Sequence, residues 1–308
     1  MPRHLRSLMD LTPRELGRVL ELAHACKKSP AAYAGKLAGR SFALLFSRPS
    51  TRTRVSFEVG IAQLGGHSLL LPGGGQMSRG ETAADTARVM SRYLHGMIVR
   101  WHDHGTIEEL AAASSVSVIN ALSDRFHPCQ AIADVMVLQE RLGDLRGTRL
   151  VFVGPANNVS NSLMLAGPRA GFDVVVACPP GLEPEPAVLA RAQADAAAAG
   201  TRVEVTHDPA AVVAGARAVY TDTWVSMGQE AEAEALRGRL VGFTVDAAMM
   251  DRAAPDAVFM HCLPAHRGEE VTAEILDGPR SIVLDQAEDR LHAQKALLLL
   301  LCEVEPWT

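Results

Sequence analysis

Short apolar runs alternate along this chain with stretches whose apolar residues recur every three or four positions. The short runs are continuous in apolar character, which is typical of strands that are covered on both faces. Parallel strands have this property, because the helices that connect them cover both faces of the sheet. We therefore predict parallel strands at 42–46, 68–71, 97–99, 116–119, 150–153, 174–177, 203–205, 218–220, 258–260 and 282–284.

The stretches between these runs have helix signals. Thr12-Pro13-Arg14-Glu15 combines a capping box with proline at the first helical position, so a helix is expected to begin there. Further helices are expected at 53–64, 130–142, 187–199 and 286–301. This alternation predicts the α/β fold class, with two domains that are each a mostly parallel sheet flanked by helices and that are joined by inter-domain helices.

The length of the chain, 308 residues, exceeds that of one ordinary core and suits two domains. The helix at 130–142, followed by a loop with two glycines, separates two sets of strands and helices of similar size. We therefore predict a first domain at 1–139 and a second at 140–286, with the C-terminal segment 287–308 packing back on the first domain.

Composition excludes several classes of protein. Hydrophobic residues make up 48% of the chain and charged residues 21%, which is a globular composition. The net charge of -5 argues against a nucleic-acid partner, and the apolar run at 296–302 is too short to cross a membrane. The N-terminus lacks the apolar segment of a signal peptide, and five dispersed cysteines without a Cys-x-x-Cys pair fit reduced thiols. We expect a cytoplasmic protein.

The densest chemical signal is Ser47-Arg48-Pro49-Ser50-Thr51-Arg52-Thr53-Arg54, which lies where an apolar run ends and a helical pattern begins. Free N–H groups of a helix start, hydroxyl donors and guanidinium groups together form a pocket suited to phosphate. The segment does not have the Gly-x-x-x-x-Gly-Lys-Ser/Thr pattern of a nucleoside triphosphate site. The alternative is a solvated helix cap with surface arginines.

Other polar residues follow the predicted strands, at the sheet edge where ligands of α/β proteins bind. Gly154-Pro155-Ala156 does not match the Gly-x-Gly-x-x-Gly pattern of dinucleotide sites, so we expect no cofactor. A zinc site at His261, Cys262 and His266 is disfavoured because no second cluster completes the four ligands, and we expect no metal. The remaining polar residues at this edge are Arg100, His127 and Asp222.

Taken together, four motifs change the interpretation: Ser50-Thr51-Arg52-Thr53-Arg54, His127-Pro128-Cys129-Gln130, Asp222 with Ser226-Met227-Gly228, and His261-Cys262-Leu263-Pro264. In this order and spacing they closely resemble the aspartate/ornithine carbamoyltransferase family. The resemblance covers essentially the whole chain. The last two motifs resemble the ornithine branch of the family.

This resemblance implies an enzyme that transfers the carbamoyl group of carbamoyl phosphate to the side-chain amine of L-ornithine, giving L-citrulline and phosphate. The residues it implies for carbamoyl phosphate are Ser50, Thr51, Arg52, Thr53, Gln76, Arg100, His127, Gln130 and Arg290. Those it implies for ornithine are Asn158, Asp222, Ser226, Met227, Cys262 and Leu263. The expected catalytic residues among them are Arg52, Arg100, His127, Cys262 and Arg290.

The resemblance also implies a homotrimer, or a multiple of trimers, in which Gln76 reaches the carbamoyl phosphate of a neighbouring subunit. We expect the anabolic reaction of arginine biosynthesis, although the sequence does not determine metabolic direction. The alternatives are a carbamoyltransferase for putrescine or an N-acylated ornithine, and a non-catalytic carbamoyl-phosphate-binding protein. Cys262 is either a base for the amine or only a hydrogen-bonding contact, and Pro155 stands where relatives commonly have an acidic residue.

Overall fold

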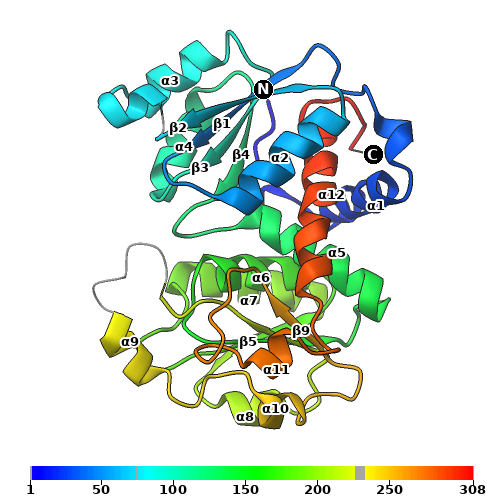
Figure 1. The fold of residues 1–308 in the computed structure, drawn as a ribbon, viewed down its shortest axis with the longest axis vertical. Coiled ribbons are helices and arrows are strands. Elements are labelled where there is room, and N and C mark those ends of the chain that lie inside the picture. Colours follow the sequence, from blue (N-terminus) through cyan, green and yellow to red (C-terminus); the bar gives the residue numbers. More distant parts are fainter. Residues whose placement is uncertain (1, 74, 226–232, 308) are drawn as a thin grey trace. The chain divides into compact units, whose positions relative to one another are not determined.

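The computed structural model describes residues 2–73, 75–225 and 233–307. The chain divides into two compact units, the first formed by Met1–Met136 with Glu288–Thr308 and the second by Val137–Ala287 (Figure 1). The predicted boundary at 139/140 lies in the same helix as the boundary between these units.

The first unit is built on a four-stranded parallel sheet with the order β2-β1-β3-β4. Its strands are β1 (Ser41–Phe46), β2 (His67–Pro72), β3 (Gly96–Arg100) and β4 (Ser117–Leu122). Its helical elements are η1 (Leu8–Asp10), α1 (Pro13–Lys28), η2 (Pro30–Tyr33), α2 (Thr51–Gln63), η3 (Gly75–Arg79), α3 (Ala83–Met90) and α4 (His104–Ala113).

The second unit has a five-stranded parallel sheet with the order β7-β6-β5-β8-β9. Its strands are β5 (Arg149–Val153), β6 (Asp173–Ala177), β7 (Val203–Thr206), β8 (Ala218–Thr221) and β9 (Val258–His261). Its helices are α6 (Asn158–Ala170), α7 (Pro186–Ala199), α8 (Pro209–Val212), α9 (Ala233–Arg239), α10 (Ala247–Met250) and α11 (Ala273–Leu276).

Two long helices continue from one unit into the other, α5 (Pro128–Leu142) and α12 (Val283–Leu301). Within the first unit, the later part of α12 is bonded to the rest of the fold. Lys295 Nζ donates to Gln63 Oε1 at 3.0 Å, and Ser117 Oγ donates to the Leu301 carbonyl at 2.8 Å. The C-terminal segment therefore belongs to the first core.

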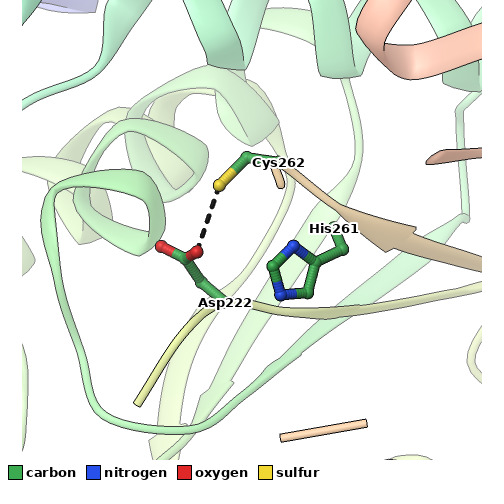
Figure 2. A group of neighbouring side chains, drawn as sticks. All are labelled: Asp222, His261 and Cys262. Atoms are coloured by element: carbon green, nitrogen blue, oxygen red, sulfur yellow. Dashed lines mark hydrogen bonds between the residues drawn. The ribbon is translucent and has the colours of Figure 1, made fainter. Parts of the chain in front are cut away.

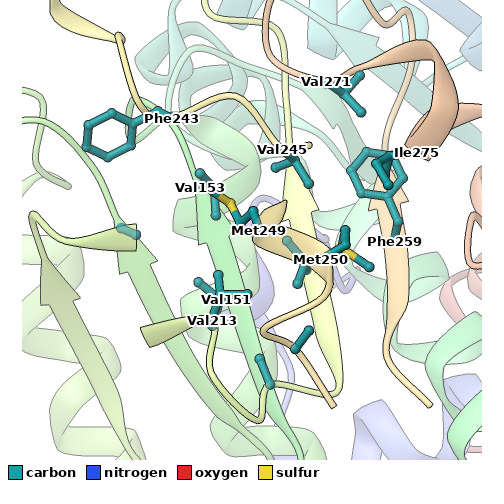
Figure 3. Close-up of a cluster of buried hydrophobic side chains, with 14 of the residues drawn as sticks. Val151, Val153, Val213, Phe243, Val245, Met249, Met250, Phe259, Val271 and Ile275 are labelled. Carbon is teal, nitrogen blue, oxygen red and sulfur yellow. The ribbon is translucent and has the colours of Figure 1, made fainter. Parts of the chain in front are cut away.

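Except for the edge strand β2, where Leu69 is 43% exposed, the strands are largely buried, as the continuous apolar runs predict. In the second unit, valines of β5 pack with residues of α10 and β9 in a buried cluster (Figure 3). Val151 and Val153 point to this face, while Leu150 and Phe152 are equally buried on the other side of the strand. The predicted α/β fold class, two domains of parallel sheet and helix, is confirmed.

Nine of the ten predicted strands are present, but the strand predicted at 282–284 is wrong. Ser281 forms only an isolated bridge with Phe259, and α12 begins at Val283. The prediction failed because the residues that follow continue the helical periodicity of this segment. Val283, Gln286 and Arg290 are buried at helical spacing while Leu284 is 77% exposed, so the apolar run is the first turn of a helix.

Each sheet has one point where the strand order reverses direction. In the first unit this point lies between β1 and β3, and in the second between β5 and β8. The loops that leave neighbouring strands on opposite faces open a crevice there, and ligands of parallel sheets bind in it. The segments that follow β1, β3, β5 and β8 carry several of the predicted site residues, among them Arg52, Asn158 and Asp222. Among the described residues, no helix is long and apolar enough to span a bilayer.

Candidate functional site: an anion pocket and an amino-acid crevice

The anion pocket of the first unit is formed by the turn from β1 into α2. Ser50 is the N-cap of α2, and its hydroxyl makes no capping hydrogen bond. The first N–H that the helix itself satisfies is that of Arg54, which donates to the Ser50 carbonyl. The N–H groups of Thr51, Arg52 and Thr53 therefore have no partner from the helix ladder, and they carry the positive end of its dipole.

This turn borders a pocket of about 440 Å³ that is bounded by the ends of β1 and β2 and by the first half of α2. Ser50 and Thr51 line it, together with Arg48 and Arg54. The guanidinium of Arg52 is exposed, so it is accessible to an anion at the helix start. The hydroxyl residues Ser50 and Thr51 and the guanidinium residues Arg48 and Arg54 thus line this space, whereas Arg52 and Thr53 are not among its lining residues.

A buried cationic cluster lies behind the same turn, within the first unit. Arg290 of α12 donates from Nη2 to Thr53 Oγ1 at 2.7 Å, and both side chains are almost fully buried. Burial, and then the charges of Arg290 and Arg100, hold the pKa of His127 well below its ordinary value of 6.5. His127 is therefore a neutral imidazole in cationic surroundings, with an N–H that can donate to a carbonyl oxygen.

Gln130 is oriented by a residue that the sequence analysis did not single out. Its Nε2 donates to Oδ1 of the fully buried Asp134, one helical turn later on α5, at 2.8 Å. Because the amide nitrogen is committed, Oε1 is fixed in direction, and this buried oxygen has no hydrogen-bond partner among the described residues. A buried acceptor in this state suits a ligand N–H, such as that of a carbamoyl group.

The candidate residues of the second unit are centred on Asp222, which follows β8 and is 9% exposed. Its Oδ2 accepts from Asn157 Nδ2 at 2.8 Å, and its Oδ1 accepts from the Thr223 N–H at 2.8 Å and from Cys262 Sγ at 3.1 Å. Figure 2 shows the thiol of Cys262 turned toward this carboxylate. The predicted pair Asp222 and Cys262 is thus brought together, with the thiol as a hydrogen-bond donor.

Asn157 is a second residue that the motifs did not reveal. Its Oδ1 caps α6 by accepting from the N–H groups of Val159 and Ser160, so only Nδ2 remains for Asp222. Asn157 is therefore committed to the protein, and Asn158, half-buried at the first position of α6, stays a prediction as the carboxylate contact. An asparagine before a helix with serine three residues later was the available signal.

Pro155 does not disturb this loop. The N–H of Gly154 donates to the Ala177 carbonyl, and the N–H of Ala156 donates to the Leu182 carbonyl. The backbone on both sides of the proline is therefore anchored, and the missing N–H of Pro155 leaves no gap.

The His261-Cys262-Leu263-Pro264 segment follows β9 and has an unusual backbone. Leu263 has φ 59°, in the left-handed region that L side chains rarely adopt, and the Leu263–Pro264 peptide is cis. The Leu263 N–H donates to His261 Nδ1 at 2.8 Å. His261 itself is fully buried at the end of β9, and its Nε2 lies 3.1 Å from Glu270 Oε1.

The zinc interpretation can be tested on this geometry. Asp222, His261 and Cys262 each place one possible ligand atom within 4.8 Å of the others. However, both ring nitrogens of His261 are already used, one by the Leu263 N–H and the other by Glu270. The thiol donates a hydrogen bond to Asp222 as well. The three side chains therefore form a hydrogen-bond network, which does not fit a metal centre.

Some predicted residues cannot be placed. Ser226 and Met227 lie outside the described residues, as does the side chain of Gln76, whose backbone belongs to η3. The remaining predicted residues fall into the two groups described above, one in each unit.

Comparison with known proteins adds independent findings. Residues 3–140 match the model for the carbamoyl-P binding domain of aspartate/ornithine carbamoyltransferase, and residues 146–301 match that for its Asp/Orn binding domain. The chain is 52% identical to an ornithine carbamoyltransferase of Symbiobacterium thermophilum, with 97% of both chains covered. It is 51% identical to the anabolic ornithine carbamoyltransferase of Pyrococcus furiosus, covering 97% of this chain and 96% of that protein. A solved structure of ornithine carbamoyltransferase from Pyrococcus furiosus superimposes with a TM-score of 0.94 at 50% identity, covering 97% of this chain and 96% of the other.

Proposed function

This chain belongs to the aspartate/ornithine carbamoyltransferase family, as its motifs predict, and we propose that it is the enzyme that carbamoylates L-ornithine to L-citrulline. The observation that supports the choice of substrate is the pair Asp222 and Cys262, a buried carboxylate that accepts a hydrogen bond from a thiol. An α-amino acid with a second amine offers an α-ammonium group to the carboxylate and a nucleophilic amine near the thiol.

The phosphate end of carbamoyl phosphate is assigned to the start of α2. The hydroxyls of Ser50, Thr51 and Thr53, the N–H groups of the first turn and the Arg52 guanidinium supply the donors. Phosphate leaves in this reaction, so donors that stabilise the additional charge on it lower the barrier.

The carbamoyl group is assigned to the buried cluster of the same unit. Arg100, Arg290 and the neutral His127 supply donors for the carbonyl oxygen, on which negative charge develops when the amine attacks. The oriented Oε1 of Gln130 accepts from the carbamoyl NH₂ group. Attack of the amine on the carbonyl carbon forms the new C–N bond, and the bond to the phosphate oxygen breaks; no covalent enzyme intermediate is required.

Ornithine is assigned to the crevice of the second unit. Asp222 and Ser226 bind its α-ammonium group, Asn158 and the Met227 backbone bind its carboxylate, and Cys262 with the Leu263 carbonyl lies near the side-chain amine. Because the thiol donates to Asp222, the geometry favours a hydrogen-bonding role for Cys262 over that of a base. Putrescine has no carboxylate, and an N-acylated ornithine has no α-ammonium group, so either would leave part of this crevice unpaired.

The test is a direct assay of the purified protein with carbamoyl phosphate and, separately, ornithine, putrescine, N-acetylornithine and aspartate, measuring the ureido product and phosphate. Ornithine is expected to be the preferred amine by at least about 10³-fold in kcat/KM, because the other amines leave buried polar groups unpaired. Product with putrescine or N-acetylornithine at comparable efficiency would establish the first alternative. Carbamoyl phosphate binding without any ureido product would establish the non-catalytic one.

The enzyme is further proposed to be a cytoplasmic homotrimer, or a multiple of trimers, that serves arginine biosynthesis. The apolar residues Val55 and Val59 of α2 and Leu69 of the edge strand β2 are 49%, 40% and 43% exposed, although they belong to neighbouring elements. Val55 also borders the anion pocket, so a second copy seated here would lie next to the site.

Light scattering coupled to size-exclusion chromatography tests this assembly. The wild-type protein is expected at three times the chain mass of 32.9 kDa or a multiple of it. Val59→Asp is expected to shift it toward the monomer, because it places a charge within the apolar surface, whereas Val241→Asp, at an 81% exposed position of the second unit, leaves the mass unchanged. A monomeric wild-type protein with full activity would contradict the proposal.

A further inference from the structure

A buried pair under the Cys262–Leu263 turn, His261 with Glu270, takes no part in the chemistry assigned above. Both side chains are fully buried. Burying an ionisable pair is costly unless each hydrogen-bonding atom is satisfied, so its presence next to a strained turn calls for a physical reason.

The hydrogen bonds determine the state of the histidine ring. The Leu263 N–H donates to Nδ1 at 2.8 Å, so this nitrogen is an acceptor and carries no proton in this arrangement. Nε2 is then the protonated nitrogen and donates to Glu270 Oε1 at 3.1 Å. One residue thus accepts from the turn and donates to the carboxylate beneath it, and the tautomer is fixed by the two partners together.

Glu270 also holds the far end of the same loop. Its Oε1 accepts from the backbone N–H of His266 at 2.6 Å, in addition to the imidazole. Burial raises the pKa of Glu270, but the hydrogen bonds from His261 and from the His266 N–H outweigh burial and lower the pKa below its ordinary value. A single carboxylate oxygen therefore closes the loop from His261 to His266, with Cys262 and Leu263 inside it.

The closed loop supports a conformation that Leu263 would not adopt unaided. A non-glycine residue at φ 59° is disfavoured by steric contact of its Cβ, and such conformations persist where surrounding structure enforces them. The bond from the Leu263 N–H to His261 is the contact that enforces it here. The base of the loop is anchored in turn, because the His261 N–H donates to Gln286 Oε1 at 3.0 Å.

We propose that His261 and Glu270 are positioning residues for the amine nucleophile. His261 holds the Leu263 backbone through Nδ1, Glu270 holds His261 through Nε2, and together they aim the Cys262 thiol and the Leu263 carbonyl. This inference deepens the proposed function and rests on it, since the turn is the part of the site assigned to the side-chain amine of ornithine.

Two substitutions of His261 separate the roles of its nitrogens. His261→Asn keeps an acceptor close to the position of Nδ1 and loses the donor to Glu270. His261→Gln keeps a donor close to the position of Nε2 and loses the acceptor for the Leu263 N–H. The matched control is His207→Gln, a half-exposed histidine of the same unit whose Nδ1 contacts the Cys178 carbonyl.

His261→Gln is expected to lower kcat/KM for ornithine at least about tenfold, the effect of one hydrogen bond on the reacting geometry. His261→Asn keeps the acceptor for the Leu263 N–H and loses only the bond to Glu270, so it is expected to lose less, about three- to fivefold, and the KM for carbamoyl phosphate stays within about twofold in both. Equal losses in the two variants, or a larger loss in His261→Asn, would overturn the assignment of Nδ1 to the turn.

A second readout does not depend on turnover. The rate at which iodoacetamide alkylates Cys262, followed by peptide mass spectrometry, reports the position of the thiol directly. His261→Gln is expected to change this rate at least about threefold because the turn loosens, with a smaller change in His261→Asn and none in His207→Gln. An unchanged rate in His261→Gln would overturn the proposal, even if activity fell.

Two substitutions of Glu270 test the same proposal if the His261 variants fail to fold. Glu270→Gln keeps an oxygen acceptor for His261 and the His266 N–H and is expected to retain kcat/KM and the alkylation rate within about threefold. Glu270→Leu removes the acceptor, and is expected to match His261→Gln in both measurements. Identical behaviour of the two Glu270 variants would overturn the proposal. Absence of ornithine carbamoylation by the wild type would instead refute the proposed function, and the alkylation results would still decide the role of the turn.

Discussion

The two groups of candidate residues, one in each unit, are suited to charged ligands by different means. In the first unit, the start of α2 offers backbone N–H groups and hydroxyls, backed by Arg290 bonded to Thr53. In the second unit, recognition depends on one buried carboxylate, Asp222, whose two oxygens accept from Asn157, Thr223 and Cys262. Under the proposed assignments, an anion is bound largely by a helix end, and a cation entirely by side chains.

This difference has consequences for robustness. Backbone donors are fixed as soon as α2 forms, so removing one side chain leaves most of the anion pocket in place. A side-chain carboxylate depends on the residues that hold it, and the second unit needs a supporting set, namely Asn157 for Asp222 and His261 with Glu270 for the turn. We therefore expect the effects of substitution to be concentrated in Arg52 for the first half and distributed over several residues in the second.

The largest effect is expected for Arg52→Ala. This side chain supplies the full charge that the backbone lacks, and we expect kcat to fall at least about 10³-fold, with folding retained because the residue is exposed. Steady-state kinetics and far-UV circular dichroism measure the two quantities. Arg14→Ala, an exposed arginine of α1, is the control, and near-normal turnover in Arg52→Ala would refute the phosphate assignment.

Asp222→Asn is expected to come second. It removes the charge that balances the α-ammonium group, and we expect the KM for ornithine to rise about 100-fold, or about 2.7 kcal/mol, with the KM for carbamoyl phosphate nearly unchanged. Initial-rate measurements with each substrate varied in turn provide the comparison. Asp208→Asn, an exposed N-cap in the same unit, should leave both values as they are; an unaltered ornithine dependence in Asp222→Asn would remove this residue from the substrate site.

The sequence predicts the first half of the site better than the second. Ser50, Thr51, Arg52 and Thr53 are contiguous, and a strand followed by a helix start determines what such residues do. The ends of parallel strands likewise predict where Arg100 and Asp222 lie. Local patterns therefore suffice when the chemistry is carried by one turn or by the end of one strand.

What local patterns did not predict are the contacts between residues that lie apart in the sequence. Asn157 meets Asp222 from 65 positions away, and His261 meets Glu270 across a loop without helical or strand periodicity. Asp134, one turn from Gln130, had a helical spacing to reveal it, but a buried carboxylate gives no distinct sequence signal. The strand predicted at 282–284 failed for a related reason, since a short apolar run does not distinguish a strand from a buried helix turn.

A smaller effect is expected for Asn157→Ser, which tests whether the support of Asp222 matters. Serine keeps an oxygen to cap α6 but has no amide donor for Asp222, so we expect the KM for ornithine to rise about tenfold with little change in thermal stability. Kinetics and a melting curve measured on the same preparation separate the two roles. A lowered melting temperature without a change in KM would mean that Asn157 serves only as a cap.

The smallest change is expected for His127, whose imidazole should not become charged where an ordinary histidine does. Burial and the charges of Arg290 and Arg100 lower the pKa of His127, so the folded protein binds its proton less readily than the unfolded chain does. The imidazole should remain neutral at a pH at which an ordinary histidine is already charged. NMR of ring-labelled histidine, with His127→Gln to assign the signal, checks this prediction. A titration centred near the ordinary pKa of histidine would contradict it.

The lowered pKa of His127 also makes the stability of the protein depend on pH. The unfolded chain gains the proton first, so this group contributes stability above the ordinary pKa, and that stability is lost as the pH falls toward the lowered pKa. A neutral donor surrounded by arginines is thus maintained at the expense of acid stability, which is the cost expected if the first half of the site is built to receive an anion.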